Sequence, residues 1–245
     1  MRRYLSFGGG VNSTALLLLM ADEVRSGEVE AVFVDHGCDY PETYAYTKLI
    51  QDEGYPITIL RPDFRGFDNL YDYCMTARLV PTRFMRWCTQ HFKIEPLHSY
   101  FETPCEVYIG IDADEERRAK GSRTDGMTNI FPLVERGIGR QGCIDIIESH
   151  GLPVPPKSGC YICPFQRRSQ WIALNQEHPE LWCKAETLER TNIEAQEERR
   201  PRDAPLWLAD RPLMEVIRAK DGRGRRVSAD QQDLFDDRRP CQCGL

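Results

Sequence analysis

The sequence predicts an α/β fold, with a doubly wound, mostly parallel sheet and a helical, cysteine-containing C-terminal region. Two observations support this prediction. The first sixty residues alternate between apolar, strand-like runs and helical runs, which is typical of a parallel sheet covered by helices. After a proline-rich link at 153–156, the chain becomes polar and helical. We therefore expect an α/β domain over residues 1–150 and a helical region over residues 151–245.

The first elements follow the rules for strand and helix patterns. Short apolar runs predict strands, and a proline at the first turn marks one helix start. The expected strands are Tyr4–Phe7, Glu30–Asp35 and Ile57–Leu60, and the expected helices are Asn12–Met20 and Pro41–Gly54. Further along, we expect strands at 106–111 and 130–133, and helices at 93–101, 141–149, 168–176, 179–198 and 212–220.

Charge and composition exclude several classes of protein. The net charge is −6 and the pI is about 5.5, which argues against coating of nucleic acid over the whole surface. The longest apolar run, Ala15–Ala21, is far shorter than the roughly 18 residues of a spanning helix, so we expect no membrane partner and a cytoplasmic location. In a reducing cytoplasm, ten cysteines favour metal ligation or thiol chemistry over disulfides.

A glycine-rich loop follows the first strand, in the segment Gly8-Gly9-Gly10-Val11-Asn12-Ser13-Thr14. Glycines let backbone N–H groups approach an anion, and the start of a helix adds the positive end of its dipole. The alternative is an ordinary tight turn between strand and helix. The residues assigned to phosphate binding are Ser6, Gly8, Gly9, Gly10, Asn12, Ser13 and Thr14.

This loop resembles the pyrophosphate loop, SGGxDS, of the adenine nucleotide alpha-hydrolase (PP-loop) superfamily. That superfamily includes ATP pyrophosphatases, tRNA thiolation enzymes and phosphoadenosine phosphosulfate reductases. Gly8 stands where Ser is usual, and Asn12 stands where Asp is usual in the pyrophosphatases. The segment Arg86–Thr89, followed by Lys93-Ile94-Glu95-Pro96, is similar to the reductase-like branch. The resemblance implies a Rossmann-like fold of the PP-loop type.

Two further strand ends resemble motifs of the same superfamily. Asp35 and His36 follow the second strand, and the resemblance implies that they lie beside the nucleotide; a simple turn is the alternative. The segment Gly110–Arg118 resembles G-I-x-x-D-E-x-R-R, with a solvated charged helix as the alternative. The roles implied are Gly110 and Arg118 in nucleotide binding, Asp114 in positioning Mg²⁺ or nucleotide, Arg117 on phosphate, and Lys93 on developing charge.

Cys160 and Cys163 form a CxxC motif that can direct two thiolates at one metal or cluster. Cys88 and the terminal pair Cys241 and Cys243 are the best further donors, because the other cysteines lie in settings typical of core thiols. A [4Fe–4S] cluster, a structural zinc and a redox dithiol are the alternatives. The resemblance to phage, CRISPR-linked and DNA-phosphorothioation members favours the [4Fe–4S] cluster, with Cys243 at the family's terminal Cys-Gly position.

The favoured function is that of an ATP-binding α-hydrolase or adenylyl transferase, with Mg²⁺ on the phosphates and a [4Fe–4S] cluster serving sulfur insertion or redox. One alternative is a sulfonucleotide reductase whose C-terminal cysteine is the nucleophile. Another is a nucleotide-binding defence partner without turnover. The sequence leaves open whether the acceptor is a nucleic acid or a protein, and whether the chain forms a homodimer.

Overall fold

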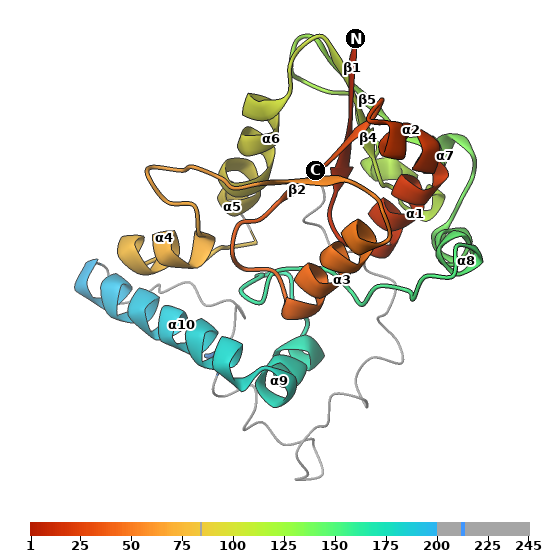
Figure 1. Cartoon of the computed structure of the whole chain (residues 1–245). Helices are drawn as coiled ribbons and strands as arrows, with labels where there is room; N and C mark the ends of the chain where they lie inside the picture. Colours follow the sequence, from red (N-terminus) through yellow and green to blue (C-terminus); the bar gives the residue numbers. More distant parts are fainter. Residues whose placement is uncertain (84, 200–211, 214–245) are drawn as a thin grey trace. The chain divides into compact units, whose positions relative to one another are not determined.

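The computed structural model describes residues 1–83, 85–199, 212 and 213 (Figure 1). Within these residues, five strands form one sheet in the order β3-β2-β1-β4-β5, and every neighbouring pair is parallel. The strands are β1 (Arg2–Phe7), β2 (Glu30–Val34), β3 (Ile57–Leu60), β4 (Cys105–Ile109) and β5 (Met127–Ile130). The expected doubly wound α/β fold is therefore confirmed.

The order in which the strands are added to the sheet reverses at its centre, beside β1. From β1 the chain winds outward to β2 and β3, and it then returns to the other side of β1 to form β4 and β5. Ser6 of β1 pairs with Ile109 of β4, so these two strands end side by side. In open parallel sheets, ligands bind at the carboxyl ends of the strands where the winding reverses. The loops that follow β1 and β4 occupy that position.

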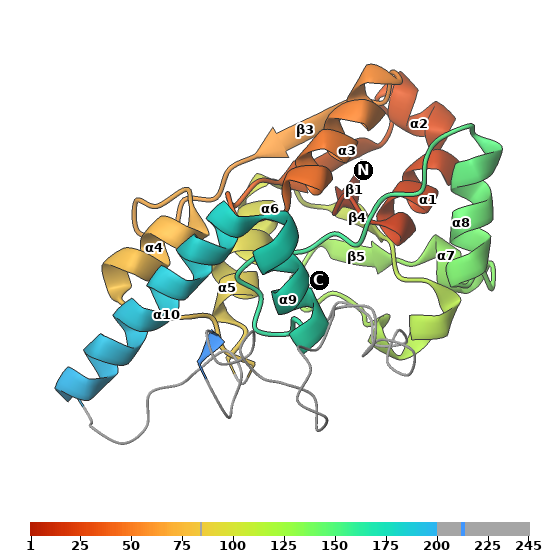
Figure 2. The ribbon, with the colours of Figure 1, turned by 90° about the horizontal axis from the view of Figure 1, so that it is seen from below.

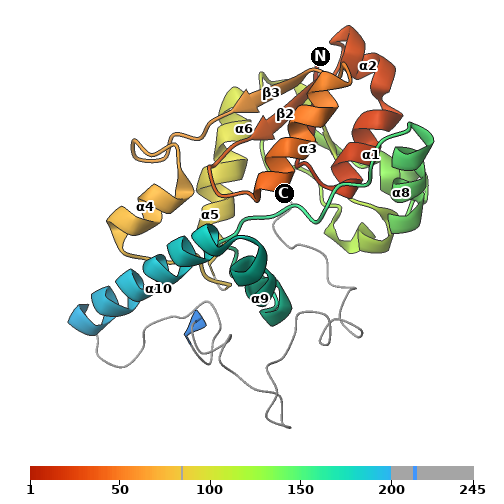
Figure 3. The same ribbon diagram turned by 60° about the horizontal axis from the view of Figure 1, so that its bottom comes forward.

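Helices cover both faces of this sheet. The elements of this compact unit are α1 (Val11–Leu19), α2 (Ala21–Ser26), α3 (Pro41–Asp52), a π-helical turn (Gln90–Ile94), α6 (Glu95–Tyr100), a 3₁₀ helix (Ala113–Arg118), α7 (Pro132–Glu135) and α8 (Arg140–Ser149). Leu5 and Phe7 pack with α1, α3 and α8, whereas Tyr4 faces α6. Figures 2 and 3 show α1, α3 and α8 on one side of the sheet and α6 on the other.

Several expected boundaries differ from the structure. The predicted strand at 130–133 is wrong: β5 covers Met127–Ile130, and Pro132 starts α7 because its ring is preorganised for a first helical turn. The expected strand at 106–111 ends at Ile109 as β4. The expected helix at 93–101 is continuous with a π-helical turn that contains Lys93. π-helical turns are rare in proteins, and those that occur frequently lie at functional sites.

Among the described residues, a second compact unit contains 69–83, 85–88, 160–199, 212 and 213, whereas the first contains 1–68 and 89–159. The expected division at residue 150 differs from this one. The helices of the second unit are α4 (Leu70–Ala77), α9 (Arg168–Glu177) and α10 (Pro179–Arg199). The short helix α5 (Trp87–Thr89) begins at the end of the 69–88 segment.

Sequence reasoning missed α4, which starts where the Asn69 side chain accepts hydrogen bonds from the N–H groups of Tyr71 and Asp72. Inside this unit, Trp171 of α9 and Trp182 of α10 meet edge to face, with ring centroids 6.4 Å apart. Most of the predicted helix at 212–220 lies outside the described residues. No helix in the described ranges has both the length and the apolar composition needed to cross a bilayer.

Candidate functional site

The glycine loop between β1 and α1 is organised by the Ser13 hydroxyl. Its Oγ accepts hydrogen bonds from the N–H groups of Gly8 (3.2 Å) and Gly10 (3.3 Å), and it donates to the Gly10 carbonyl (3.1 Å). The first N–H groups of α1 have no partner within the helix, as at every helix start. The Gly8 and Gly10 N–H groups are thus satisfied by Ser13, and the N–H groups at the start of α1 are the backbone donors that suit a phosphate.

Two glycines of the loop lie so close to neighbouring side chains that a Cβ would force a shift. Gly9 has φ +67°, and a Cβ there would lie 2.8 Å from Cγ2 of Thr43 on α3. A Cβ on Gly10 would lie 2.6 Å from Oγ of Ser158. The other expected phosphate-site residues in this region are Ser6, half-buried on β1, and Thr14, buried in α1.

The loop after β4 packs directly on the start of α1. A Cβ on Gly110 would lie 2.8 Å from both N and Cα of Ser13. Asp112, which is buried, accepts a hydrogen bond of 2.8 Å from Nδ2 of Asn12. The guanidinium of Arg140 donates to Oδ1 of the same Asn12 over 3.0 Å. The structure therefore brings the predicted Asn12 and Gly110 together, and it adds Asp112 and Arg140 to them.

The charged segment after Asp112 forms a 3₁₀ helix rather than a regular α-helix. Asp114 is exposed, and its Oδ2 accepts a hydrogen bond of 2.8 Å from the backbone N–H of Arg140. Arg118 forms an ion pair with Glu115, whereas Arg117 is exposed. Burial raises the pKa of Glu115, and the positive charge of Arg118 opposes that shift.

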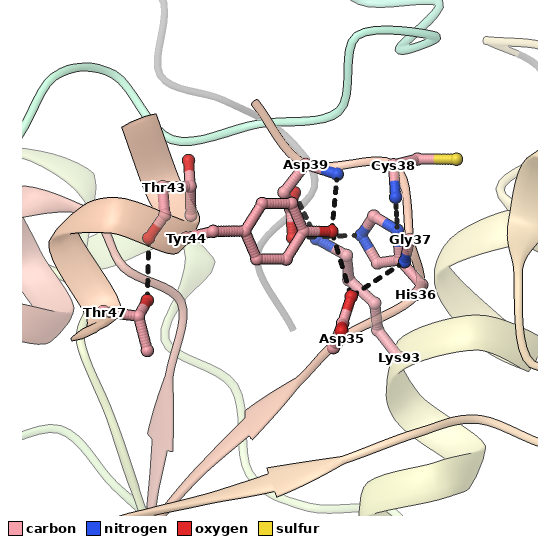
Figure 4. Close-up of polar contacts among 9 residues, drawn as sticks. All are labelled: Asp35, His36, Gly37, Cys38, Asp39, Thr43, Tyr44, Thr47 and Lys93. Atoms are coloured by element: carbon pink, nitrogen blue, oxygen red, sulfur yellow. Dashed lines mark hydrogen bonds and ion pairs between the residues drawn. The ribbon is translucent and has the colours of Figure 1, made fainter. Parts of the chain in front are cut away.

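The loop after β2 is closed around Asp35 (Figure 4). Asp35 Oδ1 accepts from the Tyr44 hydroxyl (2.9 Å) and from the Gly37 N–H (3.0 Å), and Oδ2 lies 3.5 Å from Arg61. Burial, together with the negative charges of Asp39 and Asp35, raises the pKa of Tyr44, so its hydroxyl group stays protonated as a donor. Asp35 thus occupies the strand end that the sequence predicts, and its carboxylate fixes the loop.

His36 and Asp39 lie in the same loop, and Lys93, from the π-helical turn, approaches Asp39 (Figure 4). His36 has no exposed surface, and its Nδ1 accepts from the Cys38 N–H over 3.2 Å, so the ring proton lies on Nε2. Nε2 is 3.4 Å from Asp39 Oδ2, and Asp39 Oδ1 is 4.0 Å from Lys93 Nζ. The nucleotide contact that the sequence predicts for His36 would therefore require this loop to open. Lys93 is held beside a buried carboxylate.

The predicted metal ligands within the described residues belong to the second unit. Cys160 and Cys163 are buried on one tight turn, in which the Cys163 N–H donates to the Cys160 carbonyl over 3.1 Å. Cys88 is half-buried in α5, and all three thiols are free of disulfides. Cys241 and Cys243 lie outside the described residues, so the fourth ligand stays a prediction.

Sequence reasoning missed Asp39, Tyr44, Asp112 and Arg140. Asp39 and Tyr44 follow Asp35, at the end of β2, by four and nine residues. This short spacing is a signal that could have placed them at the same strand end. Asp112 immediately follows the Gly110-Ile111 pair inside the G-I-x-x-D-E-x-R-R-like segment, so its position in that segment is the signal that could have found it. Arg140 carried no local signal, because it reaches the glycine loop from 128 residues away in the chain.

Three curated proteins that are similar to this chain are themselves described as uncharacterised. No protein-family model matches the sequence. The chain is similar to two uncharacterised proteins of Methanocaldococcus jannaschii: one is 27 % identical over 73 % of this chain and 45 % of the relative, and the other 23 % identical over 78 % and 42 %. An uncharacterised nin region protein of Escherichia phage lambda is 30 % identical over 49 % of this chain and 51 % of the relative. The chain spans about half the length of these curated relatives.

Among solved structures, the chain is similar to phosphoadenylyl-sulfate (PAPS) reductase from Candida auris in a phosphate complex. The TM-score is 0.49 at 14 % sequence identity, over 63 % of this chain and 75 % of that chain. The assignment to an α/β fold with a parallel sheet rests on the strand order itself.

Proposed function

We propose that the chain binds an adenine nucleotide with its phosphates at the glycine loop and cleaves the nucleotide at its α-phosphate. The observation that carries this proposal is the packing of Gly110 on the first turn of α1, where a Cβ would lie 2.8 Å from Ser13. This packing joins the loops after β1 and β4 where the winding of the sheet reverses. Parallel α/β sheets bind their ligands at that place, and the loop offers the backbone donors of a phosphate site.

The charges around the loop suit a substrate with several phosphates. Lys93 lies 4.0 Å from Asp39 in the loop after β2, and Arg117 is exposed in the 3₁₀ helix that follows β4. In the proposed reaction, water or an acceptor oxygen forms a bond to the α-phosphorus, while the bond to the leaving pyrophosphate oxygen breaks. Lys93 and the backbone donors stabilise the charge that develops on the leaving group. Exposed Asp114 is the proposed contact for Mg²⁺, which would bridge the phosphates and neutralise charge.

The second unit supplies the proposed cluster ligands. Cys160, Cys163 and Cys88 are three cysteines of one compact unit that form no disulfide, two of them buried on one turn, and this donor set fits an iron–sulfur cluster. A [4Fe–4S] cluster takes four thiolates, and Cys243 is the proposed fourth. Such a cluster would supply electrons or sulfur to the acceptor reaction. A nucleic acid or a protein is the proposed acceptor, which the reaction would adenylate.

The test is a nucleotide panel on anaerobically purified protein, comparing ATP, adenosine phosphosulfate and phosphoadenosine phosphosulfate. We expect ATP to bind and to release pyrophosphate. Lys93→Met should lower the turnover rate by about a hundredfold, as for the loss of one donor to a developing charge. Lys48→Met is the matched control, because Lys48 is an exposed lysine of α3 that pairs with Asp52, and its rate should equal that of the wild type.

Three outcomes would contradict the proposal in different ways. Sulfite release from a sulfonucleotide, dependent on a thiol reductant, would identify a reductase. Tight nucleotide binding without any product would identify a binding partner without turnover. No binding of any nucleotide would refute the phosphate site itself.

A further inference from the structure

Arg140 is an exposed cation whose guanidinium is held at the glycine loop by a neutral amide. Its Nη1 donates to Oδ1 of Asn12 over 3.0 Å, and its backbone N–H donates to Asp114 over 2.8 Å. In the described part of the chain, its guanidinium makes no ion pair. Arg140 is also the first residue of α8, where the helix dipole disfavours a positive charge. An exposed cation whose guanidinium hydrogen-bonds a neutral amide instead of a carboxylate is suited to receive an anion.

The orientation of the Asn12 amide follows from its other partner. Asp112 is buried, and its carboxylate can only accept hydrogen bonds, so the amide nitrogen of Asn12 must face it. The amide oxygen therefore faces Arg140. The second oxygen of Asp112 accepts from the Glu115 N–H over 3.1 Å, which fixes the carboxylate itself. A chain of hydrogen bonds thus runs from buried Asp112 through Asn12 to Arg140.

An aspartate at position 12 would break this arrangement in two ways. It would place a second carboxylate against Asp112, and it would neutralise Arg140 with a direct ion pair. Asparagine avoids both effects, because its amide is neutral and presents a donor to one neighbour and an acceptor to the other. The residue at position 12 therefore decides whether the charge of Arg140 remains available to a ligand.

We propose that Arg140 contacts the pyrophosphate group of the substrate at the glycine loop, and that Asn12, oriented by Asp112, is the residue that positions Arg140. This inference rests on the proposed function, because it takes the glycine loop as the phosphate site. It adds an anion contact from α8, an element that the loop motif does not include. Asn12 acts through Arg140 and is a positioning residue.

The experiment measures the binding of pyrophosphate to the full chain by calorimetry over a range of salt concentrations. Arg140→Gln should lower the affinity by about tenfold or more, the usual effect of losing one charge-assisted hydrogen bond. The dependence of affinity on salt should also become shallower, because one cation no longer contacts the anion. Arg140→Lys keeps the positive charge, so its affinity and its salt dependence should lie between those of Arg140→Gln and the wild type. Arg136→Gln removes the same charge from an exposed position four residues earlier, and it should change neither.

A charge swap separates positioning from simple structural support. Asn12→Asp should lower both thermal stability and affinity. Adding Asp112→Asn should restore stability, since the amide and the carboxylate have then exchanged places. Affinity should stay low, because Asp at position 12 still neutralises Arg140. Recovery of both together would show that Asn12 is only structural and would overturn the positioning role.

The outcomes distinguish this inference from the function on which it rests. Pyrophosphate binding by the wild type, with equal affinity and equal salt dependence in Arg140→Gln, would overturn the role of Arg140 and leave the glycine loop as the phosphate site. Failure of the wild type to bind pyrophosphate would refute both.

Discussion

Gly9→Ala is the sharpest test of the loop geometry, because the structure assigns it two separate costs. The φ of Gly9 is +67°, in the left-handed region, where a side chain costs about 1–2 kcal/mol. The new Cβ would also lie 2.8 Å from Cγ2 of Thr43, which is buried and β-branched and therefore stiff. Such overpacking costs about 1–3 kcal/mol. We expect Gly9→Ala to lower the free energy of unfolding by about 2–5 kcal/mol, the sum of these terms.

Gly27→Ala is the matched control for the first cost. Gly27 has φ +78°, and nothing lies within 4 Å of a Cβ built there, so only the backbone term remains. Thr43→Ser removes the Cγ2 atom and relieves the second cost. In a double-mutant cycle measured by urea unfolding, Gly9→Ala should become as mild as Gly27→Ala once Thr43 is Ser. An equal cost for Gly9→Ala in both backgrounds would refute the predicted contact between the glycine loop and α3.

Three further predictions concern the thiols and the loop after β2. Cys160→Ser and Cys163→Ser should each lose iron and acid-labile sulfide, whereas Cys183→Ser, at an exposed helical position, should keep both; stoichiometric zinc instead would point to a zinc site. Burial raises the pKa of Cys143 to about 12, so at pH 8 its thiol stays protonated and should resist iodoacetamide, while Cys183 reacts first. Tyr44→Phe should lower the free energy of unfolding by about 1–3 kcal/mol, because two partly buried hydrogen bonds of its hydroxyl are lost; an unchanged denaturation midpoint would contradict this.

The elements that sequence patterns predicted well depend on neighbours in the chain. The β1, β2 and β3 strands and the glycine loop follow from short apolar runs and from the conformational needs of Gly8–Gly10. The strand at 127–130 was misplaced by three residues, because the apolar run crosses Pro132, which begins a helix. Helix α4 was missed because its start depends on one side-chain cap, that of Asn69.

The sequence by itself determined the α/β class and the position of the glycine loop, because these are properties of local segments. The residues that would bind phosphate or ligate metal stay predictions. Only the tertiary structure decided which loops meet. Strand order places β4 beside β1, so that Gly110 packs on Ser13, Asp112 orients Asn12, and Arg140 arrives from 128 residues away. The physical reason is that local periodicity fixes which face of each element is buried, whereas the crossover connections determine which strand ends lie together and which charges face each other.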